Sequence, residues 1–184
     1  LVGMGAETVL VTGPTAEANP AGVKIVRIES AREMHDAATG ALPADIAVCA
    51  AAVADWRPAE ILEGKIKKTK GGAPPCLDMV ENPDILRSLS AAGNQRPALV
   101  VGFAAETDNV LANATAKRER KGCDWIVAND VSPDTGTFGG DRNTVHLITA
   151  DSTDDWPAMA KSDVAERLAE HIATHFANLR EAAE

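Results

Sequence analysis

Aromatic residues are scarce in this chain of 184 residues, at 3% of the composition, although the hydrophobic fraction is an ordinary 45%. Alanine and valine supply much of that fraction. Small apolar side chains favour helices packed closely on a sheet over an aromatic-rich sandwich. A chain of this length usually folds around one hydrophobic core, so we expect a single α/β domain over residues 1–184.

Paired cysteines and long apolar runs are also missing. Cys49, Cys76 and Cys123 are widely spaced and form no CxxC pair, so we interpret them as buried or incidental thiols of a reducing compartment, by default the cytoplasm. No run of about 18 apolar residues exists for a membrane span, and no signal-peptide pattern opens the chain. His171 and His175 lie one helical turn apart without an obvious third ligand, which predicts a solvated helix face and no side-chain metal site.

Basic residues are outnumbered, with 18 against 27 acidic residues and a net charge of -9. This balance argues against general binding to nucleic acid or to a membrane surface, because those partners select basic proteins. Complete GxGxxG, Walker A, GxSxG and HExxH patterns are absent, which disfavours a nicotinamide-dependent oxidoreductase and ordinary hydrolases. An anionic ligand would therefore have to be held by a local group of cations.

Apolar runs and helix signals alternate along the chain, which predicts a Rossmann-like, doubly wound, mostly parallel sheet with helices on both faces. The predicted strands are Thr8 to Thr12, Val23 to Ile28, Asp45 to Ala52, Pro97 to Phe103, Asp124 to Ala128 and a shorter additional strand within Thr137 to Thr149. The predicted helices run from the N-cap Ser30 to about Ala41, from the N-cap Asn82 with Pro83 at the first helical position to near Gly93, from about Asn109 to Lys121, and from Asp163 to Arg180. The segment from Val53 to Pro75 lacks an apolar period and is predicted to be a long loop and a candidate lid.

Two lysine-rich segments are candidates for holding an anion. The run KIKKTK falls within the predicted lid. In the helix that ends at Lys121, a spacing of four places Lys117 and Lys121 on one face, so that both ammonium groups could reach one anion while Arg118 points elsewhere. Plain alternatives stay open: a solvated loop for the first segment, and cations that offset the helix dipole for the second.

Three further features are candidates for a ligand site. Asp55 and Arg57 follow a predicted strand, where open α/β sheets bind ligands, although a local ion pair is the alternative. The NPDIL segment offers backbone N–H groups at a helix start, as every helix does. Phe103 ends its predicted strand and could cover a base or a sugar, but a core position explains it equally well.

Seven segments, taken in order, resemble phosphopantothenoylcysteine synthetase, also called phosphopantothenate–cysteine ligase. They are AAAVADWRP, KIKK, ENPDIL, VGFAAET, AKRERKG, DWIVANDV and FGGDRNTVHLI, and the resemblance spans about Thr8 to Leu168. It implies CTP-dependent ligation of 4'-phosphopantothenate to cysteine through an acyl-cytidylate, with Mg²⁺ accompanying the nucleotide. It also implies a homodimer and, in bacteria, fusion to a flavin-dependent decarboxylase domain.

The same resemblance assigns the site residues. Lys65 is the implied catalytic residue, since its charge would offset that of the departing pyrophosphate. The implied nucleotide-binding residues are Cys49, Ala50, Ala51, Asp55, Lys65, Pro83, Asp84, Ile85, Leu86, Phe103, Lys117 and Lys121. Asp55 would accept hydrogen bonds from the nucleotide or hold Mg²⁺. The family's first strand, Gly-rich turn and Asn-Arg-Ser-Ser-Gly type segment do not precede Leu1, so the alternative is a non-catalytic nucleotide-binding or dimerisation module.

Overall fold

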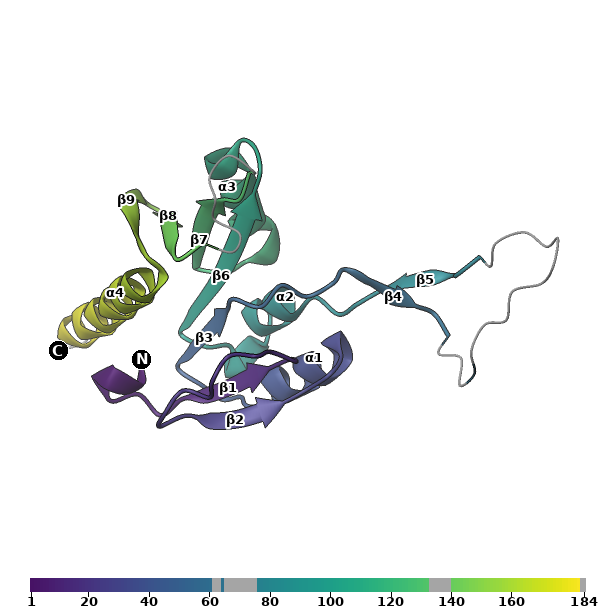
Figure 1. Cartoon of the computed structure of the whole chain (residues 1–184). Coiled ribbons are helices and arrows are strands. Elements are labelled where there is room, and N and C mark those ends of the chain that lie inside the picture. Colours follow the sequence, from purple (N-terminus) through teal and green to yellow (C-terminus); the bar gives the residue numbers. More distant parts are fainter. Residues whose placement is uncertain (61–63, 65–75, 133–139, 183–184) are drawn as a thin grey trace.

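The computed structural model describes residues 1–60, 64, 76–132 and 140–182 (Figure 1). The strands in these ranges are β1 (Val9–Thr12), β2 (Lys24–Arg27), β3 (Ile46–Cys49), β4 (Trp56–Pro58), β5 (Met79–Glu81), β6 (Leu99–Glu106), β7 (Trp125–Asp130), β8 (Arg142–Ile148) and β9 (Thr153–Ala160). The helices are α1 (Ala31–Gly40), α2 (Ile85–Ser90), α3 (Val110–Lys121) and α4 (Lys161–Glu181), with single 3₁₀ turns at Val2–Met4 and Gly93–Gln95. No helix in these ranges is long and apolar enough to cross a membrane.

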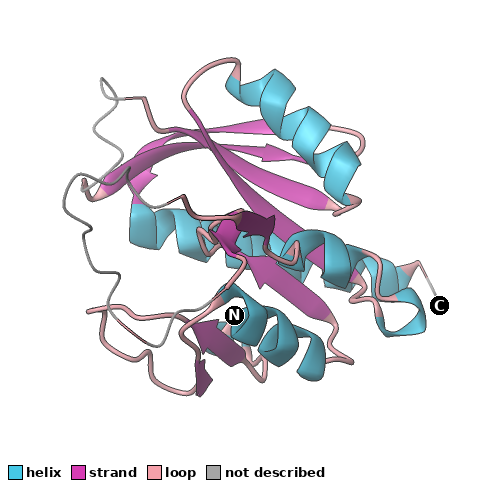
Figure 2. Cartoon of the chain, turned by 90° about the vertical axis from the view of Figure 1, so that its right-hand side faces the viewer, coloured by secondary structure: helices cyan, strands magenta, loops and turns pink. Residues whose placement is uncertain are grey.

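The main sheet has the strand order β3-β6-β7-β8-β9. β3, β6 and β7 are parallel, whereas β8 and β9 add antiparallel strands. The first four residues of β6 are buried without alternation, as expected for a parallel strand that is covered on both faces. Apolar side chains of α4 pack on one face of the sheet, and those of α2 and α3 pack on the other. Figure 2 shows helices, in cyan, on either side of the strands, in magenta. The predicted α/β fold with helices on both faces is confirmed.

A second, smaller sheet consists of β1 and β2, which pair in parallel. α1 contacts β1 and α2, and thereby connects this sheet to the rest of the molecule. Within the described residues β1 is not hydrogen-bonded to β3, and a cavity lies between the two strands. The side chains of Val9 and Val48 are consequently 40% and 38% exposed, although both belong to apolar strands.

Local signals in the sequence placed several helix ends correctly. The Ser30 hydroxyl accepts a hydrogen bond from the Glu33 N–H at 3.2 Å, which confirms the predicted N-cap of α1. α3 ends at Gly122, whose φ of 69° is in the left-handed region that favours glycine. The sequence interpretation missed β9, which contains Pro157 and lies at the edge of the main sheet, where a proline costs no ladder hydrogen bond.

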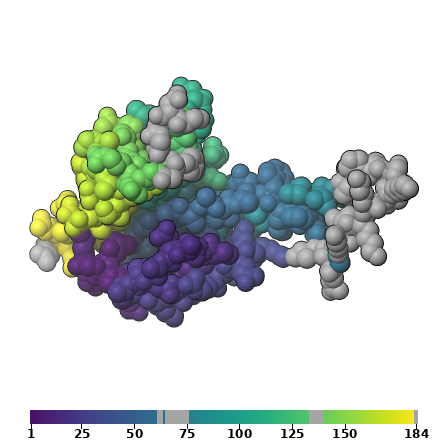
Figure 3. Space-filling model, in the orientation of Figure 1, coloured from purple at the N-terminus to yellow at the C-terminus, as the bar shows by residue number. Residues whose placement is uncertain are grey.

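The prediction of an unbroken loop from Val53 to Pro75 was wrong at its beginning. β4 pairs with β5 in antiparallel register, and the two strands project from the body of the molecule (Figure 3). Each strand has only three residues, too few for an apolar period to be recognised. Residues 61–63 and 65–75, which carry the lysine-rich part of the predicted lid, lie outside the described residues.

Candidate functional site

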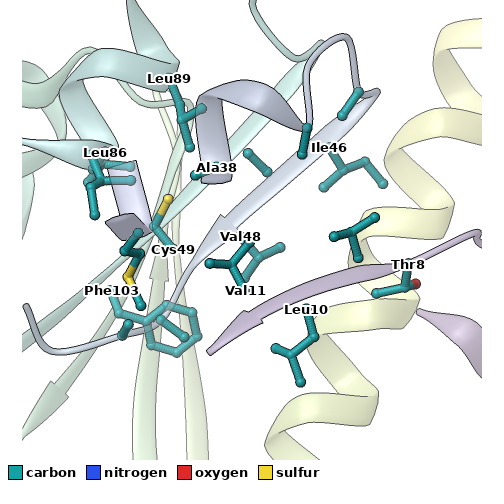
Figure 4. A pocket seen from close by; sticks show the side chains of 18 of the residues that line it. Thr8, Leu10, Val11, Ala38, Ile46, Val48, Cys49, Leu86, Leu89 and Phe103 are labelled. Atoms are coloured by element: carbon teal, nitrogen blue, oxygen red, sulfur yellow. The ribbon is translucent and has the colours of Figure 1, made fainter. Parts of the chain in front are cut away.

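The cavity between β1 and β3 has a volume of about 1870 Å³. Leu10 and Val11 of β1 line it together with Ile46 and Val48 of β3, as Figure 4 shows from close by. Residues of β6, of all four helices and of the loop after β3 also belong to the lining. The C-terminal ends of β1 and β3 open into this space, and ligands of open α/β sheets bind at such strand ends. The cavity is therefore the candidate site.

The structure brings together on this cavity every predicted nucleotide-binding residue that it describes. They come from the end of β3 and the loop after it, from the start of α2, from β6 and from α3. They are Cys49, Ala50, Ala51, Asp55, Pro83, Asp84, Ile85, Leu86, Phe103, Lys117 and Lys121. The predicted catalytic residue Lys65 lies outside the described residues. The roles of these residues toward a nucleotide stay predictions, whereas their common location is a property of the fold.

Helix α2 begins two residues later than predicted. Its N-cap is Asp84, whose carboxylate accepts a hydrogen bond from the Arg87 N–H at 3.0 Å. Asn82 and Pro83 therefore lie before the helix, and Ile85 occupies the first helical position. The prediction failed because Asn and Asp are equally good N-caps, and the sequence alone does not choose between them.

Lys121 forms an ion pair with Asp84, and its ammonium donates a hydrogen bond to the carboxylate. Lys117 lies one turn earlier on α3 and lines the same cavity, so the prediction that these two lysines share a face is confirmed, and Arg118 is not part of the lining. Burial acts to raise the pKa of Asp84, but the hydrogen bond from Lys121, the Arg87 N–H and the nearby charges lower it overall. The cavity wall thus carries cations and a carboxylate that stays ionised.

Asn82 lines the cavity and connects the segment before α2 with the segment that leads into β4. Its backbone N–H donates to the Asp55 carbonyl at 2.8 Å, and its side-chain amide donates to the Ala54 carbonyl at 2.8 Å. Arg57 donates to the Glu81 carbonyl and to the Asn82 side chain. Among the described residues Arg57 forms no ion pair with Asp55, so the alternative of a local ion pair is not what the structure contains. Asp55 is exposed and lines the cavity.

Cys49, the last residue of β3, and Phe103 of β6 place apolar surface on the cavity (Figure 4). The prediction that Phe103 ends its strand was wrong, because pairing with β7 continues β6 to Glu106. Burial, followed by the proximity of Cys123 and Asp84, raises the pKa of the Cys49 thiol to about 11. At neutral pH this group is therefore a protonated, poorly nucleophilic side chain. Phe103 packs against the main core, as the second alternative expected, and it also lines the cavity; its contact with a base or a sugar stays a prediction.

The prediction of a solvated face for His171 and His175 was wrong. The His171 ring lies 5.3 Å from the Trp156 ring, and the His175 ring lies 5.2 Å from the Trp125 ring. Their side chains are half-buried because β9 and β7, which carry these tryptophans, pack against α4. In the described parts of the chain, no group of three His, Cys, Asp or Glu side chains is placed to hold a metal ion.

Sequence reasoning missed other residues that line the cavity. Thr12 and Gly13, at the end of β1, belong to the lining, as does Asn82. The rule that singled out Asp55, a position just after the C-terminal end of a strand, applies equally to Thr12 and Gly13. Asn82 was predicted only as a helix N-cap within NPDIL, because its contacts are with residues 27 and 28 positions earlier in the chain.

Known proteins resemble this chain over most of its length. Residues 1–176 match the family described as DNA/pantothenate metabolism flavoprotein C-terminal domain. The coenzyme A biosynthesis bifunctional protein CoaBC of Vibrio vulnificus is 39% identical over 172 residues, which cover 93% of this chain and 43% of that protein. The CoaBC protein of Escherichia coli K12 is 40% identical over 174 residues, covering 94% and 43%. The chain thus spans less than half the length of these relatives.

A solved structure agrees with the sequence relatives. The crystal structure of the C-terminal domain of coenzyme A biosynthesis bifunctional protein CoaBC has a TM-score of 0.74 and 31% identity, and the match covers 96% of this chain and 80% of that one. The similarity therefore includes both the fold and the sequence. From these matches we conclude that the chain belongs to the DNA/pantothenate metabolism flavoprotein C-terminal domain family.

Proposed function

We propose that this chain is a phosphopantothenate–cysteine ligase domain that uses CTP in coenzyme A biosynthesis. The observation that carries the proposal is the single cavity on which the described nucleotide-binding candidates lie together, at the C-terminal ends of β1 and β3. Lys117 and Lys121 place two ammonium groups on this cavity, one of them paired with Asp84, and a triphosphate would need such cations in a chain with a net charge of -9. The names of the relatives place them in coenzyme A biosynthesis, which supports the same reaction.

The proposed chemistry proceeds in two steps. A carboxylate oxygen of 4'-phosphopantothenate attacks the α-phosphorus of CTP, the bond to the bridging oxygen breaks, and pyrophosphate leaves with the electron pair. The cysteine amine then attacks the acyl carbon, CMP departs, and the amine loses a proton as the amide forms. Lys117 and Lys121 would offset charge that grows on the departing pyrophosphate, and apolar residues such as Val48 would limit the access of water. Catalysis would depend mainly on positioning and electrostatics.

The proposal includes a Mg²⁺ ion that arrives with the nucleotide. Mg²⁺ in nucleotide sites is usually held by phosphate oxygens and by one or two carboxylates. Asp55 fits this requirement, because it is exposed and lines the cavity just before β4. The ion would supply additional neutralisation of the phosphates, and Asp55 would keep it at the mouth of the cavity.

Several finer points belong to the same proposal. Residues 1–184 would form a single ligase domain, joined in the full-length protein to a flavin-dependent decarboxylase. We expect a homodimer in the cytoplasm, and sedimentation of the purified chain would measure its oligomeric state.

Lys65 would act on the departing pyrophosphate, so Lys65→Ala should slow pyrophosphate release while leaving the unfolding transition unchanged.

Calorimetric titration with CTP and Mg²⁺, compared with ATP and NADP at the same salt, tests the binding site. Saturable binding with a preference for CTP is expected. Lys117→Ala should weaken CTP binding about 10- to 100-fold, since a charge-assisted hydrogen bond contributes roughly 1.5–3 kcal/mol. Arg120→Ala is the matched control, because Arg120 is an exposed cation of the same helix that does not line the cavity.

Release of pyrophosphate in the presence of 4'-phosphopantothenate tests the reaction itself. CTP binding without pyrophosphate release would favour the non-catalytic nucleotide-binding module. Tight NADP binding would instead favour an oxidoreductase. A folded chain that binds none of these nucleotides would contradict the proposed site.

A further inference from the structure

Asp84 lies at the junction of two helices and interacts with both. One oxygen of its carboxylate accepts the Arg87 N–H at 3.0 Å and caps the start of α2. The other oxygen accepts a hydrogen bond from the ammonium of Lys121, the last residue of α3. The two side chains are 35% and 23% exposed, and both residues line the cavity. A single carboxylate therefore holds a cavity cation in a fixed position relative to α2.

The ion pair has opposite consequences for a bound triphosphate and for its reaction. A lysine side chain loses up to about 2 kcal/mol of rotamer entropy when it is immobilised, so a cation that is already held in place needs less reorganisation during the reaction. At the same time a carboxylate beside a phosphate site repels the bound anion. Asp84 thus disfavours simple binding of the triphosphate while it keeps the Lys121 ammonium at the cavity wall.

We propose that Asp84 is a positioning residue, which acts through Lys121 and presets this ammonium for the charge that develops on the departing pyrophosphate. The inference rests on the proposed ligase function. It extends that function by assigning a role to the Asp84 side chain, in addition to the backbone N–H groups of the NPDIL segment. Preorganised charges contribute most where charge increases in the transition state, so the role should appear in turnover rather than in binding.

The substitution Asp84→Asn distinguishes the effect of the negative charge from the effect of the helix cap. Asn caps helices as well as Asp and retains an acceptor for the Arg87 N–H, but it removes the negative charge that holds Lys121. We expect kcat for pyrophosphate release to fall roughly 10- to 100-fold, because a displaced catalytic group has effects of this size. The dissociation constant for CTP should stay within about threefold or become smaller, since a repulsive charge is removed.

Asp124→Asn is the matched control. Asp124 is also 35% exposed, forms an ion pair with Arg96 at 2.9 Å and accepts a backbone N–H, from Val100, at 2.7 Å. It does not line the cavity. We expect this variant to lose thermal stability but to keep kcat and the CTP dissociation constant within about twofold.

A double-mutant cycle with Lys121→Ala tests whether Asp84 acts through that lysine. Lys121→Ala alone should lower kcat roughly 100-fold. If the mechanism is correct, adding Asp84→Asn to Lys121→Ala changes kcat by less than about twofold. Independent, multiplicative effects of the two changes would overturn the positioning role, and so would a wild-type kcat in Asp84→Asn.

A carboxyl ¹³C NMR titration provides a readout that needs no turnover. The pKa of Asp84 should rise in Lys121→Ala, because the hydrogen bond and the charge that lower it are removed. An unchanged titration would mean that the pair does not form in solution, and would overturn the inference alone. A wild-type chain that neither binds CTP nor releases pyrophosphate would instead overturn the proposed function, and the inference with it.

Discussion

The part of the chain before Leu86 and the part that begins there differ in how many of their residues are buried. Among the described residues before Leu86 none is fully buried, whereas β6 alone buries Leu99, Val100, Val101, Gly102 and Ala104. In Figure 3 the N-terminal region, in purple, lies against the C-terminal region, in green and yellow. β6 has a neighbouring strand on each side and helices over both faces, but β1 pairs only with β2 in the described ranges. Similar apolar strands therefore contribute very differently to stability, depending on what surrounds them.

The largest effect should come from truncating matched leucines in the two halves. Leu99 of β6 has no exposed surface, whereas Leu10 of β1 is half-buried and lines the cavity. Leu99→Ala should lower the free energy of unfolding by about 2–5 kcal/mol, and Leu10→Ala by about 1 kcal/mol or less. Urea unfolding of both variants measures the difference. Equal losses would show that β1 is as well packed in solution as β6.

Gly102→Ala should have the next largest effect. A Cβ atom at Gly102 would lie 2.6 Å from Cδ2 of Leu86 and 2.8 Å from Cδ1 of Ile126. Insertion of a methyl group into such a site costs about 1–3 kcal/mol, which the free energy of unfolding would report. Because Leu86 belongs to α2, the change should also displace Asp84 and lower kcat for pyrophosphate release. Gly40→Ala, where nothing lies within 4 Å of the added atom, is the control.

Removal of the Ser30 cap should have a smaller and more local effect. Ser30→Ala deletes the hydroxyl that accepts the Glu33 N–H, at a cost of about 1 kcal/mol. Hydrogen exchange should become faster in α1 but stay unchanged in β6 and β7, because the poorly buried half can open by itself. Ser30→Asn keeps a capping oxygen and should behave like the wild type. Faster exchange throughout β6 would show that the two halves unfold as one unit.

The pH dependence of Asp84 should give the smallest effect. Its folded pKa lies below the ordinary value, so the ionised carboxylate stabilises the fold above pH of about 4, and this contribution is lost as the pH falls through the folded pKa. Because the side chain is 35% exposed, we expect only about a few tenths of a kcal/mol. Urea unfolding of wild type and Asp84→Asn at pH 7 and at about pH 3 should show a difference that shrinks in acid. A difference that grows in acid would contradict the sign.

Sequence patterns predicted the elements that carry strong local signals. The buried runs of β6 and β7 and the glycine that ends α3 needed no tertiary information, because uninterrupted apolar residues and a left-handed helix end have few alternatives. β4, β5 and β9 were missed because they are short or contain Pro157, and only pairing with a partner strand stabilises them. The cavity itself depends on which strands pair, and no local pattern encodes that.

The candidate site was predictable where chemistry follows strand ends or helix spacing. Lys117 and Lys121 were placed on one face by their separation of four residues, and both line the cavity. The ion pair between Lys121 and Asp84 was not predictable, since the two residues are 37 positions apart and come into contact only when α2 packs against α3. The ring contacts of His171 and His175 were missed for the same reason.

The separation of β1 from β3 has a consequence for the behaviour of the chain in solution. In the described residues β1 pairs only with β2, and β3 only with β6, so each strand leaves one edge of N–H and C=O groups without a strand partner. Exposed edges with apolar side chains recruit further strands and promote aggregation or domain swapping. These edges border the proposed nucleotide cavity. A ligand in the cavity and a strand added to either of these edges would therefore occupy the same space.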